Sequence, residues 1–186
     1  MTSETANDAV PTAPARDGAL PHVLFLCTGN AARSVMAGAL CRAGGVAVRV
    51  STAGTHVVEH QPASVRTRQA LRAVGLELPA HRSRQLTAAS LEDADLVVAM
   101  AAEHVHYVRR RHPAAAPRTA TLAYLAATLR PGAEPLGARV AALGLGAVDP
   151  ESQGDVEDPA GGDDADYQAC ARTVARLMAE LAPRLA

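Results

Sequence analysis

Short apolar runs alternate with amphipathic segments along most of the chain. Four runs predict β-strands, at residues 23–26, 46–50, 96–100 and 118–122. Apolar positions at helical spacing predict helices at residues 34–43, 62–74, 103–111 and 137–143, and a last helix from Tyr167 onward. A short helix with Ser90 and Asp93 as its capping pair is expected before the third strand. Strands that alternate with helices indicate an α/β fold with a doubly wound, four-stranded parallel sheet and helices on both faces.

The ends of the chain differ in composition. Residues 1–21 are rich in Ala, Pro, Thr and Asp and predict a disordered tail, whereas residues 22–186 predict a single catalytic domain. The start lacks the basic and apolar stretches of a signal peptide, and no apolar run reaches the length of a membrane span. Three scattered cysteines give no disulfide framework. We therefore expect a cytoplasmic protein.

The net charge and the spacing of the cysteine and histidine residues indicate which partners and cofactors are not expected. The formal net charge is −1, which gives no reason to expect nucleic acid or a membrane as partner. No Cys-x-x-Cys pair is present, and His104, His106 and His112 lack a carboxylate or cysteine at fixed spacing. We expect neither a metal nor another cofactor.

One loop carries the candidate chemistry. A cysteine, five residues, an arginine and a serine join the first predicted strand to the first predicted helix: Cys27, Thr28, Gly29, Asn30, Ala31, Ala32, Arg33 and Ser34. Backbone N–H groups of such a loop form an anion nest, and the helix N-terminus adds positive potential. Arg33 supplies a planar fork for two oxygens of a phosphate. These groups and the Ser34 hydroxyl are expected to favour the Cys27 thiolate, placed to attack a bound oxyanion. The alternative is that Cys27 is only a small buried hydrophobic residue.

The sequence resembles the low-molecular-weight protein-tyrosine phosphatases, a family that includes related arsenate reductases. The resemblance runs from about Val23 to the C-terminus. Five segments match in order: VLFLCTGNAARS, STAGTH, ALRAVGLELPAHRSRQL, ADLVVAM and DVEDPAGGDDADYQ.

The resemblance implies a two-step phosphatase mechanism on a phosphorylated protein, with phosphotyrosine as the expected substrate. Cys27 would form a phosphocysteine, while Arg33 and the N–H groups of residues 28–33 stabilise the equatorial oxygens. Asp158 would protonate the leaving oxygen and then help to activate water. Asn30, Ser34 and His81 would brace the loop by hydrogen bonds. Asp149 also precedes a proline, but Asp158 fits the family spacing to the last helix.

The sequence departs from the family in three places. Ala160 follows Asp158-Pro159 where tyrosine-specific members carry an aromatic residue, so an aromatic substrate loses about 0.5–1.5 kcal/mol of ring–ring preference. Ala32 replaces the cysteine that protects the nucleophile in some members. Ala31 stands where phosphoarginine-selective members carry Thr, although the Gly-Gly after Asp-Pro resembles them.

Three other functions stay open. One is a phosphoarginine phosphatase. Another is an arsenate reductase, which would need an external thiol because no cysteine lies between Cys41 and Cys170, and Cys41 is roughly 10 Å along the first helix. A third is a non-catalytic oxyanion-binding protein. The eight acidic residues between Asp149 and Asp166 are either a solvated loop or an electronegative rim that favours basic stretches of a protein substrate.

Overall fold

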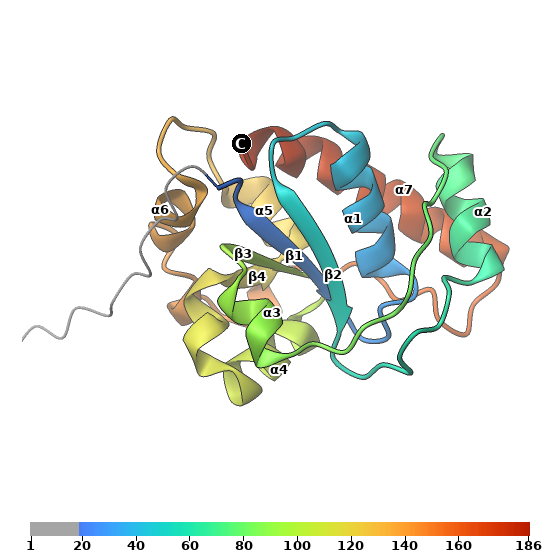
Figure 1. The fold of residues 1–186 in the computed structure, drawn as a ribbon, viewed down its shortest axis with the longest axis horizontal. Coiled ribbons are helices and arrows are strands. Elements are labelled where there is room, and N and C mark those ends of the chain that lie inside the picture. Colours follow the sequence, from blue (N-terminus) through green and yellow to red (C-terminus); the bar gives the residue numbers. More distant parts are fainter. Residues whose placement is uncertain (1–18) are drawn as a thin grey trace, which may run out of the picture.

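A four-stranded parallel sheet lies at the centre of the computed structural model, which describes residues 19–186 (Figure 1). The strand order is β2-β1-β3-β4. The strands are β1 (His22–Cys27), β2 (Arg49–Gly54), β3 (Leu96–Ala99) and β4 (Thr119–Thr121). All three pairings are parallel. The predicted fold class is therefore confirmed, while residues 1–18 of the predicted tail lie outside the described part of the chain.

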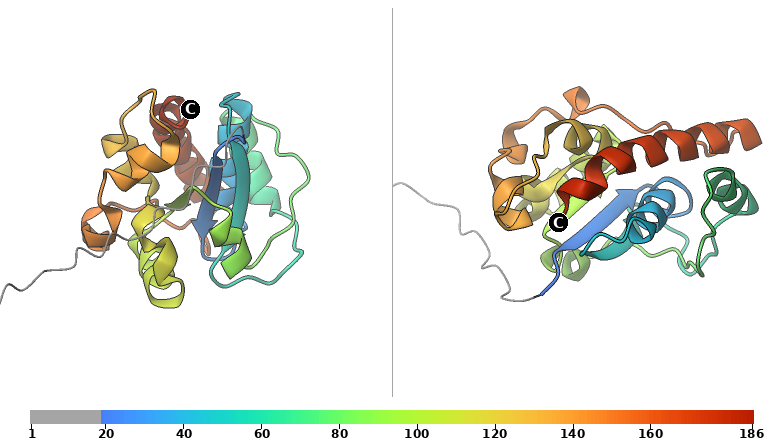
Figure 2. Two further views of the ribbon diagram at one scale, coloured as in Figure 1. Left: turned by 60° about the vertical axis from the view of Figure 1, so that its left-hand side comes forward. Right: turned by 90° about the horizontal axis from the view of Figure 1, so that it is seen from above.

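Helices cover both faces of this sheet (Figure 2). The α-helices are α1 (Arg33–Ala43), α2 (Val65–Ala73), α3 (Ala88–Glu92), α4 (Ala102–Arg111), α5 (Leu122–Thr128), α6 (Leu136–Ala141) and α7 (Asp164–Leu181). Short 3-10 segments are η1 (Pro113–Arg118), η2 (Leu145–Ala147), η3 (Pro150–Ser152) and η4 (Ala182–Arg184). No helix among the described residues combines the length and apolar character needed to span a bilayer.

Two hydrophobic cores form because side chains alternate along β1. Val23, Phe25 and Cys27 pack in the larger core with α1, α5 and α7. Leu24 and Leu26 face the opposite way, toward α3 and α4. All six residues of β1 are buried, as is usual for a strand covered on both faces. Because Cys27 is the last residue of β1, it lies at the carboxyl edge of the sheet, where ligands bind in open α/β folds.

The structure corrects four predicted boundaries. The second strand is residues 49–54, not 46–50, because Val46 and Val48 form a tight turn before it (Val48 N–H to Val46 O, 2.8 Å). Residues 52–54 therefore belong to the strand. The second helix begins after Ser64, whose hydroxyl accepts from Thr67 N–H at 3.1 Å, and not at Pro62.

The other two corrections concern helix starts. The short helix α3 is capped by Thr87 in a reciprocal pair with Ser90, so the predicted Ser90–Asp93 pair is wrong. Helix α5 was not predicted: it follows β4 directly, with Thr121 as both the last strand residue and the helix cap. Two elements therefore share one uninterrupted stretch of mostly apolar sequence.

Candidate active site

The loop between β1 and α1 brings the Cys27 sulfur against the start of the helix. Cys27 is 3% exposed, and its Sγ lies 3.0 Å from the Ser34 hydroxyl. Ser34 also accepts a hydrogen bond from Asn30 Nδ2 at 3.0 Å. The Asn30 amide thus occupies one side of the hydroxyl oxygen, which leaves the Ser34 proton free to point toward the sulfur. A negatively charged sulfur would be stabilised by that donor.

Asn30 holds the loop in a conformation that most residues avoid. Its φ is 49°, in the left-handed region where Asn is tolerated, and its side chain is fully buried. Its Oδ1 accepts from Arg84 N–H at 2.9 Å. His81 Nε2 lies 2.9 Å from the Asn30 carbonyl, and Thr67 donates to the Ala31 carbonyl at 3.0 Å. The structure therefore brings together Asn30, Ser34 and His81 around the loop.

Arg33 is the first residue of α1, and its guanidinium is almost completely buried under the loop. It donates to the Thr28 hydroxyl at 3.1 Å and to the Val156 carbonyl at 3.3 Å, and it forms an ion pair with Asp158. The side chain is 4% exposed. Glu103 is a second, more distant carboxylate, with its Oε1 3.9 Å from Arg33 Nη2. A buried guanidinium attracts an anion more strongly than an exposed one, since the surrounding protein screens the charge less than water does.

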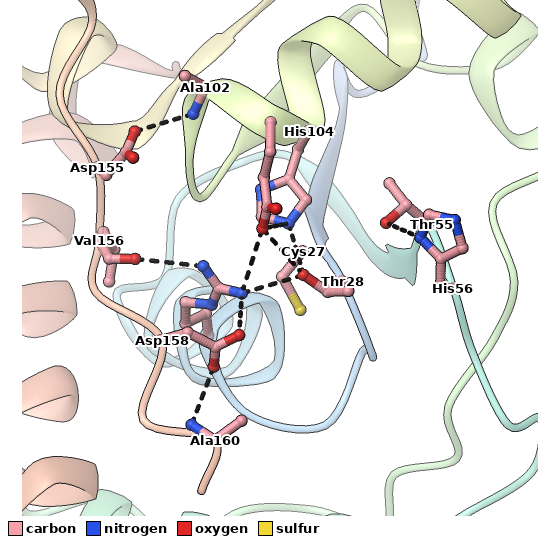
Figure 3. A network of polar contacts seen from close by, with 12 residues as sticks. Cys27, Thr28, Thr55, His56, Ala102, His104, Asp155, Val156, Asp158 and Ala160 are labelled. Carbon is pink, nitrogen blue, oxygen red and sulfur yellow. Dashed lines mark hydrogen bonds and ion pairs between the residues drawn. The ribbon is translucent and has the colours of Figure 1, made fainter. Parts of the chain in front are cut away.

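Asp158 reaches this site because the segment before it is fixed to the end of β3. Asp155 accepts from Ala102 N–H at 2.8 Å, and Val156 N–H donates to the Met100 carbonyl at 2.8 Å. These contacts bring the Asp158 carboxylate onto the Arg33 guanidinium, beside the loop that starts at Cys27 (Figure 3). The competing Asp149 is turned away, since its carboxylate caps η3 by accepting from Glu151 N–H.

Sequence reasoning missed the part of the site that comes from α4. His104 is 1% exposed, and its Nε2 lies 3.0 Å from the Thr28 hydroxyl, which also donates to Glu103 at 3.2 Å. Thr28 in turn accepts from Arg33, so α4 positions the arginine through one hydroxyl. The only signal in the sequence was the position of these residues just after a buried strand, on the edge where Cys27 also lies.

The environment of His104 keeps its ring uncharged. Burial, followed by the charge of Arg33, lowers the pKa of His104 to about 4, against the opposing effect of Asp158. The Nδ1 atom is buried and has no hydrogen-bond partner among the described residues. In the neutral ring, Nε2 can pair with the Thr28 hydroxyl.

Acidification is expected to destabilise the fold through His104. The unfolded ring titrates near 6.5 and the folded ring near 4, so between these pH values the unfolded chain binds a proton that the folded chain does not. This contribution to the free energy of unfolding is therefore present above pH 6.5 and is lost as the pH falls, by about 2 kcal/mol between pH 7 and 5.

Urea unfolding at both pH values measures this loss. We expect His104→Gln to flatten the pH dependence by about that amount, while His60→Gln, at a side chain 81% exposed, should leave it unchanged. Equal slopes for the wild type and His104→Gln would contradict the assignment.

A glycine and a histidine complete the wall on the β2 side. A Cβ atom at Gly54 would lie 2.4 Å from the Thr28 carbonyl and 2.9 Å from Asn30 N, so only glycine lets β2 approach the loop. After this glycine, Thr55 N–H and His56 N–H donate to the carbonyls of Cys27 and Thr28, each at 2.9 Å. The His56 ring stands edge-on to Tyr107, with centroids 5.5 Å apart. His56 thus flanks the loop.

A cavity of about 480 Å³ opens beside Arg33. Its lining includes the carboxylates of Glu103, Glu151, Asp155, Glu157 and Asp158, against the cations Arg33 and Arg110. Part of the acidic stretch between Asp149 and Asp166 therefore lines the cavity beside Arg33 as an electronegative wall. His106, a weak metal candidate, instead lies 3.0 Å from Glu151.

Comparisons with known proteins agree with this arrangement. A sequence model described as "Low molecular weight phosphotyrosine protein phosphatase" matches residues 22–131. A protein-arginine-phosphatase of Geobacillus stearothermophilus is 32% identical over 88% of this chain and 95% of its own length. The solved structure of the YwlE arginine phosphatase from that organism covers 89% of this chain and 92% of its own, at 32% identity and a TM-score of 0.72.

Tyrosine phosphatases are among the relatives as well. A low molecular weight protein tyrosine phosphatase from T. tengcongensis has a TM-score of 0.68 at 30% identity, covering 87% of this chain and 97% of its own. Etp, a low molecular weight protein-tyrosine-phosphatase of Escherichia coli K12, is 35% identical over 46% of this chain and 58% of its own length. The family match spans more than half of the sequence. This chain belongs to the low molecular weight phosphotyrosine protein phosphatase family.

Proposed function

We propose that the chain hydrolyses a protein phosphomonoester through a phosphocysteine at Cys27, with phosphotyrosine as the expected substrate. One observation carries the proposal: a sulfur at the end of β1 contacts a serine hydroxyl at 3.0 Å and shares its loop with the buried guanidinium of Arg33. That pairing suits a nucleophile held beside an anion-binding group.

The first step transfers the phosphoryl group to sulfur. The Cys27 thiolate attacks phosphorus while the bond from phosphorus to the leaving oxygen breaks, and Asp158 gives its proton to that oxygen. Arg33, Thr28, Gly29, Asn30, Ala31, Ala32 and Ser34 form the phosphate-binding loop, whose guanidinium and backbone N–H groups stabilise the equatorial oxygens. In the second step Asp158, now ionised, takes a proton from water, which attacks phosphorus and releases the Cys27 thiolate.

Phosphoarginine is a second candidate substrate. The relative named a protein-arginine-phosphatase matches nearly the whole chain. The acidic lining of the cavity beside Arg33 would also favour a cationic guanidinium as the leaving group. An arsenate reductase would depend on an external thiol. Burial raises the pKa of Cys41 to about 11 and that of Cys170 to about 12, which keeps both thiols protonated and poor at resolving a disulfide. The free thiols of the described cysteines suit a reducing compartment such as the cytoplasm.

A substrate panel tests the proposal. Matched peptides carrying phosphotyrosine, phosphoarginine or phosphoserine are compared with arsenate plus an external thiol. We expect hydrolysis of phosphotyrosine above phosphoserine. Turnover of phosphoarginine alone would move the assignment to the second candidate, and arsenate reduction without hydrolysis would overturn it. Phosphate binding without any turnover would indicate a non-catalytic oxyanion-binding protein.

Replacing Asp158 by Ala should separate substrates by their leaving groups. For phenyl phosphate, a poor leaving group, kcat/KM is expected to fall by about 10²–10⁴-fold because the general acid is lost. For p-nitrophenyl phosphate the expected fall is roughly tenfold or less, because this leaving group departs without a proton. Steady-state kinetics on both esters measure the difference, with Asp149→Ala as the matched Asp-Pro control. Equal losses for the two esters would contradict the role of Asp158.

A further inference from the structure

A second cavity, of about 330 Å³, lies on the outer side of the sheet at the exposed edge of β2. It is enclosed by α1, by β2 and by residues 78–84, which run past α1 toward the end of β2 (Figure 1). We call this cavity the basic groove after four of its lining residues, Arg42, His81, Arg82 and Arg84; the other polar residues of the lining are Ser51 and Thr52. No acidic residue is part of this lining, whereas the cavity beside Arg33 has five carboxylates.

The arginines of the basic groove have no carboxylate partner. Five of the arginines within residues 19–186 form ion pairs, and Arg42, Arg82 and Arg84 are among those that do not. Arg42 Nη2 donates only to the Val50 carbonyl at 3.0 Å, and Arg82 Nη1 only to the His60 carbonyl at 3.4 Å. Most of their N–H groups are therefore available to a ligand.

The charges of Arg42 and Arg84 act on His81. Burial lowers the pKa of His81, and the charges of Arg42, Arg84 and nearby Arg68 lower it further against the hydrogen bond to Asn30. Burial also lowers the pKa of Arg42. A concave region with several cations and no counter-charge favours an anion, and the guanidinium forks match the geometry of phosphate oxygens.

The basic groove also touches the support of the phosphate-binding loop. His81 Nε2 lies 2.9 Å from the Asn30 carbonyl, and Arg84 N–H donates to Asn30 Oδ1 at 2.9 Å. The same short segment therefore forms a wall of the groove and holds the left-handed residue of the loop. A ligand that orders residues 81–84 would order Asn30 as well.

We propose that the basic groove binds a small phosphorylated anion at a site separate from the catalytic loop, and that this ligand stabilises the segment that braces Asn30. The cation set and the cavity select phosphoryl groups presented on a small molecule, with the forks of Arg42 and Arg84 as the principal contacts. The proposal is of binding alone: the ligand is neither consumed nor transformed there.

Calorimetric titration of tripolyphosphate into the full-length protein tests this proposal, at constant ionic strength and with orthovanadate present to occupy the catalytic loop. We expect one binding event per chain, weakened about tenfold or more in Arg42→Gln/Arg84→Gln, because two charge-assisted contacts are lost. The matched control is Arg130→Gln/Arg172→Gln, two exposed arginines outside the groove, and it should bind as the wild type does.

Amide chemical shifts give a second measurement and do not depend on vanadate. Binding in the basic groove should shift the signals of residues 78–84 and of Asn30 in the wild type, but not in the groove variant. If the double variant fails to fold, Arg84→Gln alone carries the test, since its exposed side chain makes no contact that folding requires. No binding heat, or equal affinity in the groove and control variants, would overturn the proposal.

Discussion

Replacing Cys27 by Ser is expected to lower kcat on p-nitrophenyl phosphate by at least about 10⁴-fold, as for loss of a nucleophile in other covalent catalysts. The serine hydroxyl stays protonated at neutral pH, so it cannot replace the thiolate even though it fits the same space. The fold should persist, because the change removes no hydrogen bond of the backbone. Initial rates measured over a wide range of enzyme concentration quantify the loss.

The control for this variant is Cys41→Ser, the same exchange at a fully buried cysteine on α1. It should lower the melting temperature, because it buries a hydroxyl in the hydrophobic core. Below that temperature it should retain kcat within a few-fold, since Cys41 lies outside the network around Cys27. If Cys27→Ser kept most of the wild-type rate, the sulfur could not be the nucleophile.

Replacing Arg33 by Lys is expected to lower kcat/KM by about 10³-fold, although the charge is kept. The guanidinium reaches Thr28, the Val156 carbonyl and Asp158 at the same time, from a side chain only 4% exposed. An ammonium group has no planar fork and cannot make these contacts while also holding two oxygens of a phosphoryl group. The loss should appear on every phosphate ester, whatever its leaving group.

Affinity for orthovanadate separates this effect from a folding defect. Arg33→Lys should bind vanadate much more weakly, whereas Arg49→Lys, a change in a half-exposed pair with Asp93, should leave vanadate binding and kcat/KM unchanged. Vanadate affinity equal to that of the wild type in Arg33→Lys would contradict the role of the guanidinium as the anion clamp.

The sequence correctly predicts those elements whose apolar and polar residues form a clear pattern within one short segment. The run Val23–Leu26 is buried on both faces, so its apolar residues predict a strand without ambiguity. Strand β2 lies at the sheet edge and contains Ser51, Thr52 and Gly54, so the apolar Val46 and Val48 beside it drew the prediction to the wrong residues. Helix α5 was missed since no turn residue separates it from β4.

The residues of the candidate site fall into the same two groups: those within one segment can be found in the sequence, and those brought together from distant segments cannot. The loop from Cys27 to Ser34 is one continuous segment, so its residues and spacing can be found in the sequence. The contacts of His104 with Thr28 and of Arg84 with Asn30 join residues 76 and 54 positions apart, and they depend on strand order and loop paths. The clash that a side chain at Gly54 would make with the loop depends on the β1–β2 register, in which Cys27 pairs with Gly54. No local pattern encodes these relations.

The most direct measurement is to trap the covalent intermediate. Asp158→Ala should slow the hydrolysis of the phosphoenzyme, so acid quenching during turnover of p-nitrophenyl phosphate should capture it. Peptide mass spectrometry is expected to find one phosphoryl group, bonded to the sulfur of Cys27. A phosphoryl group on another residue, or turnover with no phosphorylated peptide at any quench time, would contradict the account.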